Sequence, residues 1–115
     1  MTEKLEPALI SATDAAVRVE GGARLIDVRS EKGRSAAGAL PGADIVDRDR
    51  LEETFAGVSR DQPVVVVCGS VNGSGPVADW LVGNGFVDVA HVDGGFPAWK
   101  DSGLPVGEPA EPAAG

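Results

Sequence analysis

Four consecutive valines, Val64 to Val67, followed at once by the only cysteine of the chain, Cys68, restrict the possible folds more than any other segment. A β-branched run of this length predicts a strand buried on both faces. A polar, glycine-rich loop, residues 69–74, follows the cysteine and leads into an amphipathic stretch, Val77 to Val82. A strand, a tight loop and a helix in this order hold a side chain in front of a helix N-terminus, where backbone N–H groups favour an anion. Cys68 is therefore predicted to be a reactive thiol, although cysteines are more often small buried core residues.

The length and composition of the chain predict one domain. The 115 residues include 43% hydrophobic side chains, which is enough for an ordinary core. We expect a flexible N-terminus over residues 1–8 and a folded domain over 9–106. Residues 107–115 are rich in Pro, Ala, Gly and Glu and are expected to form a disordered tail.

Charge and cysteine usage exclude several classes of function. Ten basic and eighteen acidic residues give a net charge of -8, and the basic residues are scattered, so no nucleic-acid partner is expected. No apolar run approaches the ~20 residues of a membrane span, and no signal peptide is visible, so we expect a cytoplasmic protein without a membrane partner. One cysteine excludes an intramolecular disulfide and argues against a thiolate metal site. No cofactor and no metal are expected.

Strand-like and helix-like segments alternate along the chain, which predicts an α/β fold with a mostly parallel sheet and helices on both faces. The expected strands are residues 9–10, 25–28, 43–46, 64–67 and 87–92. The expected helices are residues 12–20 with Ser11 in a capping box, 31–37, 47–55, one that Ser74 caps with Pro76 in its first turn, and a short one that starts at Gly94 and Gly95.

Four segments, in order, resemble those of rhodanese-like domains, the single-domain sulfurtransferase family. The similar segments are Leu25-Ile26-Asp27-Val28-Arg29, Gly38-Ala39-Leu40-Pro41-Gly42-Ala43, Val64 to Cys68, and Asp93 to Trp99 with Ser102-Gly103-Leu104-Pro105-Val106. Each motif alone is weak, but their order and spacing cover the chain from about Ile10 to Val106. The resemblance implies a five-stranded rhodanese-like sheet and a cysteine that carries a sulfane sulfur as a persulfide.

The resemblance also implies the residues of the site and its substrates. Cys68 would be the catalytic nucleophile, and the loop that follows it would bind substrate through Gly69, Ser70, Val71, Asn72, Gly73 and Ser74. Asp27, Arg29 and Arg34 are candidates for supporting the site, the first two also as a structural pair. The expected substrates are a small sulfur donor, thiosulfate or a persulfide, and a thiol or cyanide-like acceptor. A protein partner is possible but is not identified by the sequence.

The cysteine loop departs from the family pattern in its charge. Family members commonly carry an arginine five residues after the cysteine, whereas this chain has Gly73, and no Arg or Lys occurs between Arg60 and Lys100. A dianionic donor would lose a charge-assisted contact there, so thiosulfate is predicted to be a poor donor unless Arg34 supplies the cation. Gly73→Arg is predicted to raise turnover with thiosulfate if the backbone accepts a side chain.

Two alternatives to a sulfurtransferase stay open. A non-catalytic rhodanese-homology module would bind a partner or small anion and sense redox state through Cys68. A phosphatase or arsenate reductase of the related Cys-loop type is the least favoured, because such loops need an arginine near their end. His91 is expected to be a packed, hydrogen-bonded residue, and the charge-rich segment 47–53 is expected to be a solvated helix face.

Overall fold

The computed structural model describes residues 6–69 and 71–107, and for residues 71 and 72 only the backbone. The elements follow the chain in the order β1 (Ala8–Ile10), α1 (Ala12–Glu20), β2 (Arg24–Asp27), α2 (Glu31–Ala37), β3 (Asp44–Ile45), the 3-10 helix η1 (Arg48–Arg50), α3 (Leu51–Phe55), β4 (Val64–Val67), α4 (Val71–Gly83), β5 (Val89–Val92) and α5 (Gly95–Asp101). The expected flexible ends, 1–8 and 107–115, lie largely outside the described residues. No described helix is long and apolar enough to span a bilayer.

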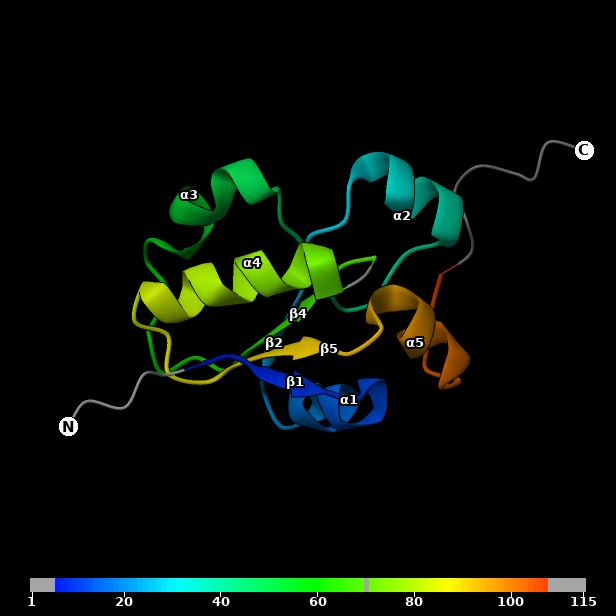
Figure 1. The fold of residues 1–115 in the computed structure, drawn as a ribbon, viewed down its shortest axis with the longest axis horizontal. Coiled ribbons are helices and arrows are strands. Elements are labelled where there is room, and N and C mark those ends of the chain that lie inside the picture. Colours follow the sequence, from blue (N-terminus) through cyan, green and yellow to red (C-terminus); the bar gives the residue numbers. More distant parts are fainter. Residues whose placement is uncertain (1–5, 70, 108–115) are drawn as a thin grey trace, which may run out of the picture.

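The strands form one five-stranded sheet in the order β1-β5-β4-β2-β3, and every pairing is parallel. The predicted α/β fold with a parallel sheet is therefore confirmed. Helices α3 and α4 lie on one face of the sheet and α1 on the other (Figure 1). β4 is the central strand, so its backbone is hydrogen-bonded on both sides and its carboxyl end opens between β2 and β5.

The four valines of β4 supply both halves of the core, because side chains alternate across a strand. Val64 and Val66 pack with α3 and α4, whereas Val65 and Val67 pack with α1 and α5. All four valines are at most 1% exposed. The prediction of a strand buried on both faces is confirmed, and the next residue along the chain leaves the sheet at its carboxyl edge.

The N-terminal part of α4 differs from the expected structure. The helix begins at Val71 rather than after Ser74, so Ser74 is not its N-cap and Pro76 lies inside the helix. Ser74 is 1% exposed, and its hydroxyl lies 3.0 Å from Nδ1 of His91 on β5. This contact between residues distant in sequence accounts for the buried hydroxyl that local capping rules misassigned.

The segment after β3 also differs from the single helix expected over residues 47–55. It divides into η1 and α3, because Asp47 caps η1 by accepting a hydrogen bond from the Asp49 N–H, and Arg50 leaves helical geometry at φ -119°. The 3-10 turn follows β3 directly at the carboxyl edge of the sheet. It can therefore direct a side chain toward the end of β4.

Candidate functional site

Cys68 lies immediately after β4 at the carboxyl edge of the sheet. Its carbonyl accepts a 2.7 Å hydrogen bond from the Phe96 N–H, which fixes its backbone against α5. The residue is 6% exposed and packs with the core on the α4 side. α4 begins at Val71, so the thiol lies near a helix N-terminus, an arrangement that favours an anion. Only a small part of Cys68 is open to a reagent, and access depends on the cavity beside it.

Arg48 of η1 is the residue that approaches the thiol. Its Nη2 atom lies 3.7 Å from Sγ of Cys68, within the range of a hydrogen bond to sulfur. A guanidinium at this distance can donate to an anion at the sulfur position. Segment 47–53 is exposed as expected, apart from Leu51, and Arg48 has the further contact with the thiol that the expectation did not include.

Asp27 and Arg29 form a buried ion pair at the end of β2. Arg29 donates from Nε to Asp27 Oδ1 at 2.9 Å and from Nη2 to Oδ2 at 2.7 Å, and the Asp27 carboxylate also accepts the Arg29 backbone N–H at 3.1 Å. The two side chains are 1% and 4% exposed. The Arg29 guanidinium also stacks on Phe96, 3.9 Å from the ring centroid. The expected pairing of these residues with each other and with backbone is confirmed.

Arg34 on α2 does not line the cavity beside Cys68. Its Nη1 donates to the Arg29 carbonyl, which ties Arg34 to the turn between β2 and α2. It lines a neighbouring charged cleft of about 720 Å³ that also includes Arg29 and Arg48. Of Arg29, Arg34 and Arg48, Arg48 is the arginine that contacts the Cys68 sulfur.

The cavity beside Cys68 has a volume of about 430 Å³ and lies between α2, η1 and α5. Its lining residues are Arg29, Ser30, Gly33, Ala36, Ala37, Arg48, Cys68, Gly69, Phe96 and Pro97. Small and apolar side chains make most of the wall, and two guanidiniums supply its positive charge. The cavity can therefore hold a small anion or a sulfur atom attached to Cys68.

The structure describes only some residues of the loop after Cys68, residues 69–74. Gly69 lines the cavity, whereas Ser70 and the side chains of Val71 and Asn72 lie outside the described residues. Gly73 lies in the first turn of α4, and a Cβ added there would approach the Cys68 Sγ well inside 3.0 Å. Gly73 does not have a positive φ. The backbone conformation at position 73 therefore suits a side chain, but its Cβ would collide with the Cys68 thiol.

His91 packs under α4 as expected. Burial lowers the pKa of its imidazole from the ordinary value of 6.5, and the nearby carboxylates Asp79 and Asp93 oppose this effect. Its Nδ1 atom is paired with the Ser74 hydroxyl. His91 therefore supports the N-terminal part of α4, and the structure gives it no contact with Cys68.

We expect the free energy of unfolding to decrease as pH falls below about 6.5. The unfolded chain takes up a proton on His91 there, while the folded protein keeps the imidazole neutral until its lower pKa is reached. The contribution is present in full above the unfolded pKa. Urea denaturation at pH 7.5 and pH 5.5 should show a smaller decrease in His91→Gln than in the wild type, and equal decreases would contradict the assignment.

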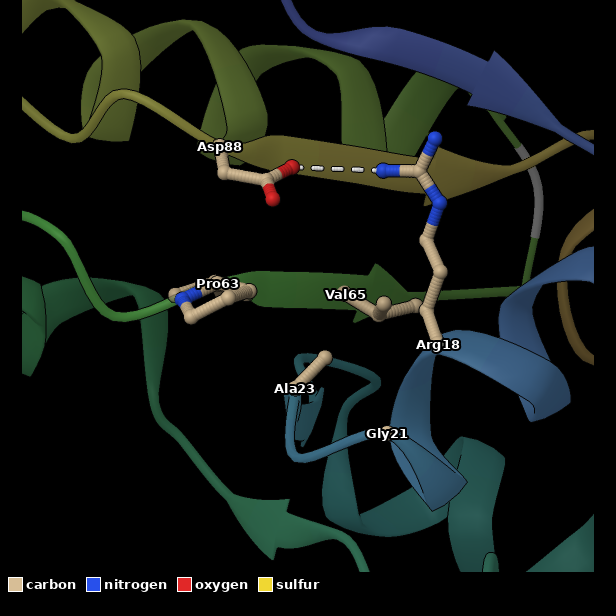
Figure 2. A pocket seen from close by; sticks show the side chains of 7 residues that line it. Arg18, Gly21, Ala23, Pro63, Val65 and Asp88 are labelled. Atoms are coloured by element: carbon tan, nitrogen blue, oxygen red, sulfur yellow. Dashed lines mark hydrogen bonds and ion pairs between the residues drawn. The ribbon is translucent and has the colours of Figure 1, made fainter.

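A third hollow lies at the other end of the strands (Figure 2). It is lined at the amino end of β4 by Pro63, Val64 and Val65, and Arg18 and Asp88 form an exposed 3.2 Å ion pair across it. It offers no thiol and lies at the far end of β4 from Cys68. The candidate active site is therefore the cavity at the carboxyl edge.

Sequence comparison identifies the family of the chain. The rhodanese-like domain family matches residues 11–102. The thiosulfate sulfurtransferase GlpE of Pseudomonas putida strain GB-1 is 38% identical over 99 residues, which cover 86% of this chain and 84% of that protein. GlpE of Pseudomonas savastanoi pv. phaseolicola is 40% identical over 81 residues, or 70% of this chain and 76% of that protein.

Solved structures agree with this match. The rhodanese-like domain of the Alr3790 protein from Anabaena has a TM-score of 0.79 at 22% identity, covering 96% of this chain and 88% of the domain, and supports the fold. The polysulfide-sulfur transferase homodimer of Wolinella succinogenes has a TM-score of 0.74 at 28% identity, covering 90% of this chain and 80% of that one. The chain belongs to the rhodanese-like domain family, whose curated relatives here are sulfurtransferases.

Proposed function

We propose that this protein transfers a single sulfur atom through a persulfide on Cys68. The observation that carries the proposal is the position of the thiol, which lies at the end of the central strand, opens on a small cavity and contacts a guanidinium at 3.7 Å. The similarity to thiosulfate sulfurtransferases supports the same reaction class. A reducing compartment such as the cytoplasm would keep Cys68 reduced.

In the first step the Cys68 thiolate attacks the outer sulfur of the donor. With thiosulfate, the new S–S bond forms to Cys68 while the S–S bond of the donor breaks, and sulfite leaves with the bonding electron pair. The charge of -3 on thiolate plus thiosulfate equals that on the cysteine persulfide anion plus sulfite. With an organic persulfide the leaving group is a thiolate instead, and no oxidant or reductant is needed in either case.

In the second step an acceptor nucleophile takes the outer sulfur. A thiolate acceptor becomes a persulfide, cyanide becomes thiocyanate, and the Cys68 thiolate is released for another turnover. Backbone N–H groups of the loop from Gly69 to Ser74 are proposed to stabilise the sulfur anion, which is stabilisation of the oxyanion-hole kind. The buried Asp27–Arg29 pair is proposed to hold the cavity wall, with Arg34 bracing the adjoining turn.

Intact-mass spectrometry tests the proposal directly. We expect the wild type to gain the mass of one sulfur atom after incubation with thiosulfate or with a low-molecular-weight persulfide, and to lose it on addition of a thiol. Cys68→Ser, a nearly isosteric control, should show no gain while keeping its circular dichroism spectrum. Absence of an adduct with both donors would favour a non-catalytic module that binds or senses through Cys68.

A further inference from the structure

We propose that Arg48 binds the anionic group of the sulfur donor and the sulfur anion carried on Cys68. The cation that the cysteine loop lacks would thus come from η1, a different part of the chain. This inference rests on the proposed function and adds a substrate-binding residue to it. It identifies the ligand as the negatively charged leaving group of the donor, a sulfonate or a thiolate.

The first support is the space in front of Gly73. A Cβ at this position would collide with Sγ of Cys68, and it would also lie 3.1 Å from the Cys68 Cβ and 3.5 Å from Nη2 of Arg48. The absence of a side chain at position 73 therefore leaves space that the Cys68 thiol fills, with the Arg48 guanidinium next to it. Gly73 and Arg48 both lie next to the Cys68 sulfur, and the glycine leaves room for the thiol that Arg48 contacts.

The second support is the charge around the cavity. Arg29 lines the same cavity, but its charge is paired with Asp27 through Nε and Nη2, and only its buried Nη1 has no hydrogen-bond partner among the described residues. Arg50, two residues after Arg48, pairs with Glu53. Within the part of the chain that the structure describes, Arg48 makes no ion pair with a carboxylate, so its charge remains available to an anion.

The third support is the apolar character of the remaining wall. Ala36, Ala37, Phe96 and Pro97 also line the cavity, and Phe96 lies directly against the Arg29 guanidinium. Phe96 is buried, whereas Ala36, Ala37 and Pro97 are exposed, so the cavity opens to solvent and its apolar side chains offer no polar group that competes with a guanidinium for an anion. Beside this wall Arg48, which has no carboxylate partner among the described residues, favours the anionic end of a small donor over a neutral ligand.

Two alkylating reagents that differ in charge test the role of Arg48 without requiring sulfur transfer. Iodoacetate is an anion and iodoacetamide is neutral, and both react with the same thiol. We expect Arg48→Gln to lower the ratio of the iodoacetate to the iodoacetamide rate constant at least about tenfold, the range of one charge-assisted hydrogen bond. Arg48→Lys should recover part of the ratio, because it keeps the charge.

Arg50→Gln is the matched control, since Arg50 lies on the same 3-10 helix but pairs with Glu53. Its ratio should equal that of the wild type. Circular dichroism and a thermal melt establish whether each variant is folded, and Arg48→Lys provides the comparison if Arg48→Gln is not. An unchanged ratio in folded Arg48→Gln, or an equal decrease in Arg50→Gln, would overturn the inference.

Steady-state kinetics with thiosulfate separate this inference from the proposed function. Arg48→Gln should raise KM about tenfold or more for this dianion and also lower kcat, because sulfite leaves as an anion. If the wild type forms a Cys68 persulfide but Arg48→Gln matches it in both parameters, the role of Arg48 is wrong and sulfur transfer stands. If the wild type forms no persulfide, the alkylation ratio still decides whether Arg48 binds anions.

Discussion

Gly73→Ala is expected to reduce the rate of sulfur transfer about 100-fold without unfolding the domain. The added Cβ would collide with Sγ of Cys68, so either the thiol must rotate away or the first turn of α4 must shift. A displacement of a reacting group by about 1 Å can lower a rate by this factor. The same change should alter the iodoacetamide rate constant of Cys68, which is measured independently of any donor.

Two other glycines provide matched controls for this variant. A Cβ at Gly75, two residues further along α4, would meet only Cε1 of His91 at an ordinary 3.9 Å, and one at Gly69 would meet nothing within 4 Å. Gly75→Ala should retain activity and increase stability by about 0.5–1 kcal/mol, the usual gain from alanine inside a helix. Equal activity in Gly73→Ala and Gly75→Ala would contradict the steric argument.

This geometry reverses one expectation from the sequence. Gly73→Arg should lower rather than raise turnover with thiosulfate, because the Cβ of any side chain at position 73 would collide with the Cys68 sulfur. An arginine at position 73 would require the Cys68 thiol to rotate away or the first turn of α4 to shift. Comparing loop sequences alone cannot reveal this, since it depends on where the Cys68 thiol lies relative to the first turn of α4.

The elements that follow a local pattern could be predicted from the sequence. The valine run gave the limits of β4, and Ser11 with the glycines after Glu20 gave those of α1, because strand burial and helix capping depend on neighbouring residues. Cys68 could also be predicted as the candidate nucleophile, since the strand, loop and helix around it are contiguous.

Features that depend on contacts between distant segments could not be predicted from neighbouring residues. Ser74 resembles an N-cap, but its hydroxyl is paired with His91 seventeen residues later. Arg48 lies in a charged segment that resembles a solvated helix. One signal could have found it: the residue follows a predicted parallel strand, and the carboxyl ends of parallel strands share the edge that carries Cys68.

Asp27→Asn is expected to destabilise the domain by about 3–5 kcal/mol, the usual effect of removing one partner from a buried ion pair. The carboxylate accepts three hydrogen bonds from Arg29, and an asparagine of the same shape would present an uncharged amide to a guanidinium that is 4% exposed. Urea denaturation measures the loss. Glu53→Gln, which breaks the exposed pair with Arg50, should change the unfolding free energy by less than about 1 kcal/mol.

A double variant separates the effect of losing the whole ion pair from the effect of leaving one buried charge without its partner. Combining Asp27→Asn with Arg29→Met removes the buried charge that Asp27→Asn leaves unpaired, and the backbone N–H of residue 29 can still donate to the amide oxygen. The double variant should therefore be more stable than Asp27→Asn alone, although it lacks both charges. If its loss equals the sum of the two single losses, the two charges do not stabilise each other, and Asp27 must be buried for a reason other than Arg29.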